Sequence, residues 1–224
     1  GDGVRKNPNP LYRVYVSHSD RRNLYYAHLD IESGRVTTIE GVDLKVPVTR
    51  LIAEDCKVWD SGQRMTNPPA VMDDGAGRPL MLLPVAGQES PWKGEHVFIR
   101  WNGDDWTQVP VASLNSTWSG GWLTQEDDVL TALITTGDAD GSLLSYGGGR
   151  IEKWMSSDRG DSWQKESEWV PEEGMIYNNP RPVPTSRGDI LDGAYTMFGW
   201  EGPDGLTKEK CCGRAFLYFR GEWV

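Results

Sequence analysis

The sequence of 224 residues has little of several features that define large protein classes. It contains no run of about 18 apolar residues, so no membrane-spanning helix is expected. Its three cysteines, Cys56, Cys211 and Cys212, are too few for a disulfide framework. Positive charge is scarce as well, because 23 Lys and Arg against 33 Asp and Glu give a net charge of -10. That balance argues against nucleic acid as the main partner, since phosphate binding requires a basic surface.

Helical periodicity is nearly absent too, and what is present indicates β-structure. The apolar stretches are short, rich in Val, Tyr, Trp and Leu, and separated by Gly, Asp, Asn and Pro. Short strands bounded by turn residues are typical of an all-β protein. The 26 Gly and 14 Pro fit many tight turns, and the 11 Trp are an unusually large number.

The strands fall into a repeat. The segments HVFIRWNGDDW (96–106), IEKWMSSDRGDSW (151–163) and AFLYFRGEWV (215–224) each read as a strand, a turn with Gly and an acidic residue, and a Trp opening the next strand. Their Trp residues, Trp106, Trp163 and Trp223, are 57 and 60 residues apart. Two Asn-Pro segments, 66–84 and 178–195, form a second repeated pattern. Repeats of this length with four strands each predict a β-propeller of four-stranded antiparallel blades.

The repeat divides the chain into four blades of one propeller segment, at about 1–45, 46–112, 113–170 and 171–224. The expected strands, in blade order, are 11–18, 23–30 and 36–45; 67–74, 79–86, 96–102 and 106–112; 118–124, 128–136, 150–156 and 162–170; 180–186, 189–198, 212–220 and one that begins at Trp223. The first blade lacks its first strand and the last is cut short. This pattern predicts a piece of a larger propeller, and a complete four-bladed propeller is the alternative.

The stretch SSDRGDSW (156–163) has the spacing S-x-D-x-G-x-x-W and resembles the Asp-box of sialidase-like propellers. In such a turn we expect Asp158 to accept backbone N–H groups, Gly160 to adopt a positive φ and Trp163 to pack between blades. The motif therefore predicts architecture, and it directs the search for function to the opposite face.

The wider chain resembles BNR-repeat proteins related to ulvan lyases and other propeller polysaccharide lyases. The resemblance rests on RNLYYAHLD (22–30), on the long stretch 46–84 and on SSDRGDSW. It implies a seven-bladed propeller that cleaves a glycosidic bond to a uronic acid by β-elimination. The implied substrate is an acidic polysaccharide of the ulvan or rhamnose–glucuronate type, and the implied setting is secreted or periplasmic, with GDGVRKNPNP as a mature or trimmed start.

β-Elimination requires a group that neutralises the uronate carboxylate, a base for the C5 proton and an acid for the leaving oxygen. We expect His18 and Tyr177 to be the catalytic base or acid, although the principal His could lie in blades outside this sequence. Arg is suited to the carboxylate because its planar fork binds it with two hydrogen bonds. The expected substrate-binding residues are Arg21, Arg22, Arg64, Asn67, Asn179, Arg181 and Trp118. Solvated surface arginines, turn-capping asparagines and packed tryptophans are the structural alternatives.

The chemistry itself requires no cofactor. Cys56, Cys211 and Cys212 are expected on one face, where they could hold a structural zinc; calcium is a second possible structural ion. Adjacent strand residues such as Cys211 and Cys212 point to opposite sides, which favours free buried thiols. His28 and His96 fall within outer strands and are not expected to be catalytic.

Three functions follow from these features. The first is a polysaccharide lyase acting on a uronate glycan, with no nucleic-acid or membrane partner, and with the remaining blades as a possible separate piece. The second is a sialidase-like glycoside hydrolase, for which no Tyr–Glu pairing is identifiable. The third is a non-catalytic glycan-binding propeller, because one fold serves many functions.

Overall fold

The computed structural model describes residues 21–88, 93–137, 147–173, 175–187, 190–201 and 212–223. Within this part of the chain there are sixteen β-strands, one α-helix of four residues and one short 3-10 helix. The all-β prediction is therefore confirmed. No helix in the described ranges is long and apolar enough to cross a membrane. The chain forms two compact units, which meet in sequence between Thr66 and Asn67.

The first unit contains two small antiparallel pairs. Its elements are β1 (Leu24–Tyr25), β2 (His28–Leu29), β3 (Val36–Thr37), α1 (Arg50–Ala53), the 3-10 helix η2 (Glu54–Cys56) and β4 (Lys57–Trp59). Strand β2 pairs with β3, as expected for neighbouring strands of one hairpin, whereas β1 pairs with the distant β4. The strand expected at 11–18 and its His18 lie outside the described residues.

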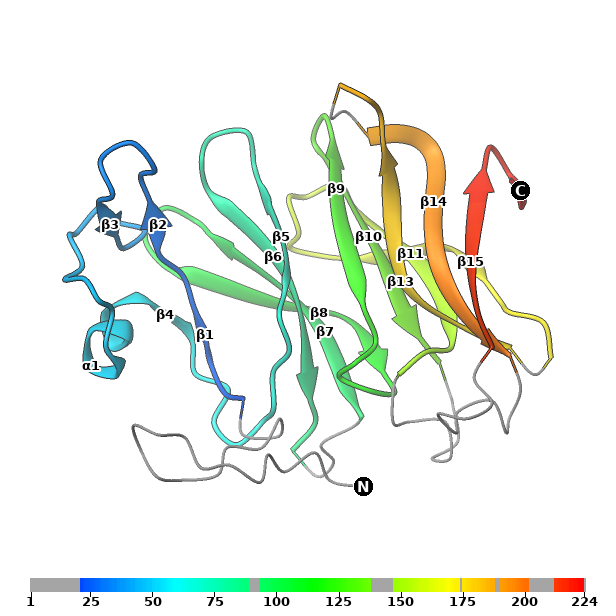
Figure 1. Ribbon diagram of the computed structural model, residues 1–224, viewed down its shortest axis with the longest axis horizontal. Helices are drawn as coiled ribbons and strands as arrows, with labels where there is room; N and C mark the ends of the chain where they lie inside the picture. Colours follow the sequence, from blue (N-terminus) through cyan, green and yellow to red (C-terminus); the bar gives the residue numbers. More distant parts are fainter. Residues whose placement is uncertain are drawn as a thin grey trace. The chain divides into compact units, whose positions relative to one another are not determined.

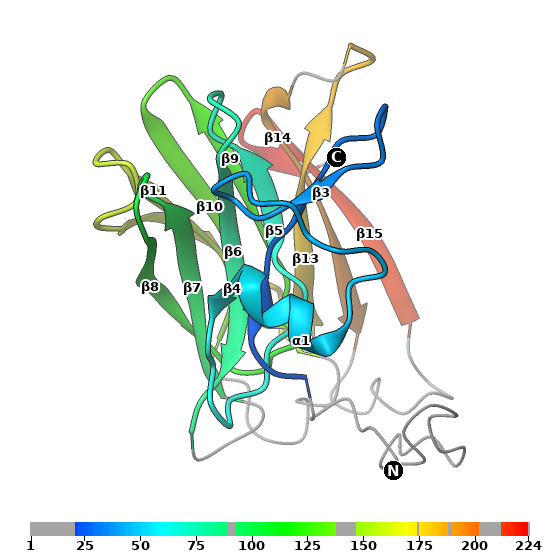
Figure 2. The same ribbon diagram turned by 90° about the vertical axis from the view of Figure 1, so that its left-hand side faces the viewer.

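The second unit consists of three four-stranded antiparallel sheets (Figure 1). Sheet I contains β5 (Ala70–Asp73), β6 (Pro79–Ala86), β7 (Gly94–Trp101) and β8 (Trp106–Leu114). Sheet II contains β9 (Gly121–Glu126), β10 (Val129–Thr136), β11 (Arg150–Ser156) and β12 (Gln164–Trp169). Sheet III contains β13 (Met175–Pro184), β14 (Ile190–Glu201), β15 (Cys212–Phe219) and β16 (Glu222–Trp223). In each sheet the strands are neighbours in the order of the sequence, and Figure 2 shows β13, β14 and β15 of sheet III side by side.

Apolar residues of sheets I and II form one core. Every residue of β6 is buried, which explains why its sequence PLMLLPVA is apolar throughout instead of alternating. The buried cluster contains Leu80, Leu82, Phe98 and Val111 from sheet I, and Leu123, Leu130, Ala132 and Ile134 from sheet II. Full burial of a large apolar side chain contributes about 1.5–3 kcal/mol. The interface between the two sheets is thus a main source of the unit's stability.

Sheets II and III share a second, more aromatic cluster. Ile151 of sheet II packs with Tyr177 and Met197 of sheet III, and Trp169 and Phe216 lie against them. Trp169 of β12 also contacts the ring of Tyr218 of β15 edge to face, with centroids 5.2 Å apart. Sheet II is therefore packed against a neighbour on each side.

The hairpin turn SSDRGDSW has the expected geometry. Asp158 accepts hydrogen bonds from the backbone N–H of Ser162 at 2.9 Å and from the hydroxyls of Ser156 and Ser162 at 2.7 and 2.6 Å. Gly160 has a φ of 93°, and a Cβ there would overlap the ring of Phe98 in sheet I. The expected contributions of Asp158 and Gly160 are confirmed.

The tryptophan that ends this stretch joins two sheets. Trp163, next to β12 of sheet II, packs edge to face on Phe98 of sheet I, with ring centroids 5.2 Å apart. Trp163 also lies against the shared core of sheets I and II. The predicted packing of this ring between neighbouring four-stranded units is therefore confirmed.

Each sheet of the second unit has two ends. At the loop end the first strand of each sheet begins. Segment 115–120 at this end connects sheets I and II, and residues 147–149 lead into β11. At the hairpin end lie the tight turns 74–78, 102–105, 127–128 and 157–163. Because the strands are antiparallel, a residue that precedes β5 and one that follows it lie at opposite ends.

Candidate functional site at the loop end

Segment 115–120, sequence NSTWSG, is a buried polar connection between sheets I and II. Asn115 donates from Nδ2 to the carbonyl of Gly148 at 2.6 Å, and Ser119 donates from Oγ to Asn115 Oδ1 at 3.0 Å. Gly148 in turn donates its N–H to Ser119 Oγ at 3.3 Å. Satisfied networks of buried polar groups hold a loop in one conformation. The loop end is therefore built as a rigid support.

Asn178 of β13 fastens sheet III to this support. Its side chain is 1 % exposed. Its Oδ1 accepts from the N–H of Gly120 at 3.0 Å, from Thr135 Oγ1 at 3.2 Å and from the N–H of Asn179 at 2.8 Å. Its Nδ2 donates to the carbonyl of Trp118 at 3.3 Å. One amide thus connects three segments that are distant in sequence.

A β-bulge follows directly and sets the direction of Arg181. The register of β13 against β14 shifts between Asn178 and Arg181, and Asn179 has a φ of 52°. Gly120 lies close beside it, so that a Cβ at that position would displace the side chain of Asn179. Bulges re-aim the side chains that follow them and are frequent next to functional sites.

Arg181 and Trp122 form a cation and aromatic pair on the adjacent first strands β13 and β9. The guanidinium carbon of Arg181 lies 4.4 Å from the centroid of the Trp122 ring, and Nη1 donates to the carbonyl of Gly121 at 2.9 Å. Arg181 is exposed, and its other N–H groups have no partner in the described part of the chain. Partial burial of the guanidinium lowers the pKa of Arg181, yet the group remains charged. The pair offers a fixed positive fork beside an aromatic ring.

Two other residues predicted from sequence are Tyr177, which precedes Arg181 on β13, and Trp118, whose carbonyl accepts a hydrogen bond from Asn178. Tyr177 is 5 % exposed, and its ring packs edge to face on Phe216 with centroids 5.3 Å apart. Burial raises the pKa of Tyr177, which favours its protonated form. Trp118 is half-buried, and its backbone N–H donates to Ser116 Oγ at 3.2 Å.

The remaining predicted residues are divided between the two units. Asn67, the first residue of the second unit, is buried and donates from Nδ2 to the carbonyl of Thr117 at 2.5 Å. Arg21, Arg22 and Arg64 belong to the first unit. The guanidinium of Arg22 donates to the carbonyl of Arg21 at 2.9 Å, and that of Arg64 lies 5.3 Å from the centroid of Trp59. Asn67, Trp118 and Asn179 therefore lie along segment 115–120 and its network, whereas the ring of Tyr177 lies in the core shared by sheets II and III.

The cysteines do not form a metal site within the described ranges. Cys56 is half-buried, and its thiol lies 3.3 Å from the carbonyl of Ala53; burial raises its pKa. Cys212 lies in β15, and Cys211 is outside the described residues. No group of three His, Cys, Asp or Glu side chains that could hold a metal occurs in the part of the chain that the structure describes.

Two residues of importance here, Asn178 and Trp122, lie on the face expected from sequence but were not chosen as site residues. Asn179 was chosen instead of Asn178, because two adjacent asparagines give no sign of which one is buried. Trp122 was one of several tryptophans near the expected site, and the signal that could have singled it out is Gly120–Gly121, which allows a close approach of the neighbouring strand.

The three sheets place the protein among all-β proteins with an ulvan lyase fold. A solved structure described as a new family of polysaccharide lyase, PL25 ulvan lyase, bound to -[GlcA(1-4)Rha3S]-, superposes on 88 % of this chain and 42 % of its own, with a TM-score of 0.66 at 17 % identity. A second solved structure of a PL25 ulvan lyase matches with the same values.

Comparison of the amino-acid sequence with known proteins also finds a relative. The Ulvan Lyase-PL25 of Pseudoalteromonas sp. (strain PLSV) is 22 % identical over 156 residues, which cover 66 % of this chain and 30 % of that protein. No family model matches the sequence. The relatives found by sequence and by structure are thus polysaccharide lyases, and the chain spans less than half of their length.

Proposed function

We propose that the chain belongs to a polysaccharide lyase that cleaves a uronic-acid-containing glycan by β-elimination. The observation that carries the proposal is the Arg181–Trp122 pair, held at the loop end of a fold that resembles ulvan lyases. A sugar ring stacks on an aromatic side chain, while a guanidinium fork takes its carboxylate through charge-assisted hydrogen bonds. Both groups are present on adjacent strands.

In the proposed reaction Arg181 neutralises the carboxylate and makes the C5 proton more acidic. A base takes this proton, the electron pair forms the C4–C5 double bond, the C4–O bond breaks and the leaving oxygen gains a proton. Tyr177, whose raised pKa keeps it protonated although it makes the hydroxyl a weaker acid, remains our candidate for the acid, and His18 for the base. Trp118, Asn67 and Asn179 are proposed to shape the site. Arg21, Arg22 and Arg64, in the first unit, remain proposed substrate-binding residues.

The architecture proposed for the whole protein is a seven-bladed propeller, in which sheets I to III are consecutive blades. The sequential strand order within each sheet and the sheet-to-sheet cores support this proposal. A polymer substrate cannot enter a cell, so a secreted or periplasmic location is part of it. A structural zinc or calcium ion remains a proposal as well.

The test is turnover of ulvan by the full-length protein, followed by ultraviolet absorbance of the double bond conjugated to the carboxylate. We expect Arg181→Ala to lower kcat/KM about 100-fold and Arg181→Lys to restore only part of it, because a lysine lacks the fork. Arg187→Ala, in the exposed turn of the same β13–β14 hairpin, is the matched control and should leave activity unchanged. New reducing ends without a rise in absorbance would identify a hydrolase and contradict the proposal.

A further inference from the structure

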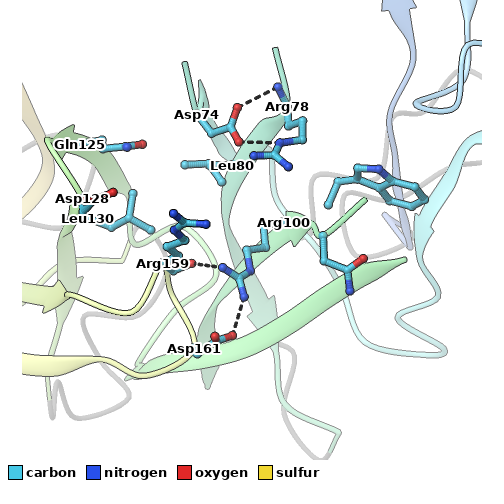
Figure 3. Close-up of a pocket in the computed structure, with 11 residues that line it drawn as sticks. Asp74, Arg78, Leu80, Arg100, Gln125, Asp128, Leu130, Arg159 and Asp161 are labelled. Carbon is cyan, nitrogen blue, oxygen red and sulfur yellow. Dashed lines mark hydrogen bonds and ion pairs between the residues drawn. The ribbon is translucent and has the colours of Figure 1, made fainter. Parts of the chain in front are cut away.

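A cleft with a volume of about 450 Å³ lies at the hairpin end, between sheets I and II (Figure 3). Its walls come from the turns of both sheets: Asp74, Arg78, Leu80, Arg100, Trp101 and Asn102 of sheet I face Gln125, Asp128, Leu130, Arg159 and Asp161 of sheet II. Asn67 and Arg181 belong to the opposite end of the sheets. The cleft is therefore separate from the Arg181–Trp122 site.

Two of the three arginines in the cleft are engaged. Arg78 pairs with Asp74 through Nε at 2.7 Å. Arg100 donates to the carbonyl of Arg159 and to Asp161 Oδ1, each at 2.6 Å. The Arg78–Asp74 pair lies within one turn of sheet I, whereas Arg100 joins sheet I to the turn 157–163 of sheet II. Within each pair the two charges cancel.

The Arg159 side chain and the Asp128 carboxylate have no hydrogen-bond or ion-pair partner in the described part of the chain. Figure 3 shows Arg159 rising from its turn toward Leu130. An unengaged guanidinium, a carboxylate acceptor and the apolar edges of Leu80 and Leu130 match the carboxylate, hydroxyls and C–H face of one acidic sugar ring. Small-molecule sites have volumes of about 300–1,000 Å³, so one or two rings fit.

The backbone shows how the Arg159 side chain can be removed without distorting its turn. Arg159 has a φ of 62°, a conformation that strains any residue with a Cβ. Glycine or asparagine would adopt it more easily, and the same turn already uses Gly160 at a positive φ. The equivalent turn of sheet III has the same pair of positive φ values, 50° at Arg220 and 95° at Gly221. The conformation therefore belongs to the turn type, and a glycine in place of Arg159 would relieve strain without changing the turn.

We propose that this cleft is a second, non-catalytic site that binds one uronate unit of an acidic polysaccharide. Arg159 binds the carboxylate, and Asp128 accepts hydrogen bonds from ring hydroxyls. The proposal rests on the proposed function only for the identity of the polymer. Such a site would keep a long chain attached to the enzyme between cleavage events.

The binding test is a titration of the isotope-labelled protein with methyl glucuronide and, separately, with methyl glucoside, monitored by amide chemical shifts. The glucuronide should shift amides of the turns 125–130 and 158–161, and the neutral glucoside should not. Arg159→Gly should weaken this binding about tenfold while raising Tm, because glycine relieves the strain. Equal shifts with both sugars, or unchanged binding in Arg159→Gly, would overturn the proposal.

A second measurement separates this site from the catalytic one. Arg181→Ala should leave the glucuronide shifts at the hairpin turns intact. Arg159→Gly should raise KM for the polymer and leave kcat and the turnover of a short oligosaccharide unchanged. Binding at the turns without any lyase activity would overturn the proposed function alone, whereas activity without such binding would overturn only the second site.

Discussion

At both ends of the sheets in the second unit the chain reverses direction, but the polar groups of the connecting segments are satisfied in different ways. At the loop end the connecting segment is buried, and its polar groups are paired with side chains such as Asn178 and Asn115. At the hairpin end the turns are mostly exposed, and groups such as Asp158 bond within their own turn. A buried polar group without a partner costs far more than an exposed one, which water can satisfy. Changes at the loop end should therefore be the more destabilising.

Two glycines with positive φ give the largest expected contrast. At Gly149, at the loop end, a Cβ would overlap the carbonyl oxygen of Thr136, whereas at Gly103, at the hairpin end, it would meet nothing within 4 Å. We expect Gly149→Ala to lower the free energy of unfolding by about 3–5 kcal/mol through strain and overlap. Gly103→Ala should cost about 1 kcal/mol through strain alone. Urea denaturation measures both, and equal losses would refute the comparison.

Two asparagines test the hydrogen bonds themselves. Asn178→Ala leaves the N–H of Gly120 and the carbonyl of Trp118 without this partner in a buried site, and should cost about 3 kcal/mol. Asn102 accepts from the N–H groups of Asp104 and Asp105 in an exposed turn, and Asn102→Ala should cost about 1 kcal/mol. Chemical unfolding of the two variants provides the measurement. A loss at Asn102 as large as that at Asn178 would show that burial is not the deciding factor.

Two titrating groups extend the contrast to pH. Burial lowers the pKa of His96 to about 4 from 6.5, and its Nε2 lies 3.2 Å from the carbonyl of Thr135 at the loop end. As pH falls, His96 gains its proton at a higher pH in the unfolded chain than in the folded protein. The free energy of unfolding therefore decreases by about 2–3 kcal/mol as pH falls from about 6.5 to about 4. His96→Asn should reduce this pH dependence, whatever its effect at pH 7.

Asp158 provides the counterpart at the hairpin end. Hydrogen bonds from the hydroxyl and the N–H of Ser162, and from Ser156, lower the pKa of its carboxyl below the ordinary value of 3.8. Its stabilising effect is therefore complete above that value and is lost as pH falls further. Asp158→Asn should alter Tm relative to the parent by a constant amount near neutral pH, with convergence only in strong acid. Convergence near pH 6 would contradict the assignment.

The sequence predicted well those strands whose limits depend only on neighbouring residues. The strands 79–86 and 150–156 begin and end as expected, because their apolar runs stop at turn residues. The pairing of β1 with β4 was missed, since two short segments about 30 residues apart carry no local signature of contact. Strand β13 begins at Met175 instead of at residue 180, because the bulge at Asn179 lets the strand continue past Pro180.

The candidate site was predictable in part. Arg181 followed from the chemistry that a uronate requires. The pairing of Arg181 with Trp122 depends on the contact between β9 and β13, which are about 50 residues apart in sequence, and on a bulge that breaks the alternation of side chains. Neither is encoded in a short stretch. The cleft at Arg159 was missed because it forms only where turns of two sheets meet.

The packing of Gly160 and Trp163 on Phe98 has a consequence for folding cooperativity. A turn of sheet II completes the core of sheet I, so neither sheet can bury its apolar residues fully alone. In arrays of this kind each unit is stabilised mainly by its immediate neighbours, and opening spreads from one unit to the next. Amide hydrogen exchange of β7 and β10 should therefore be governed by a single opening event, in which the two sheets separate and unfold together.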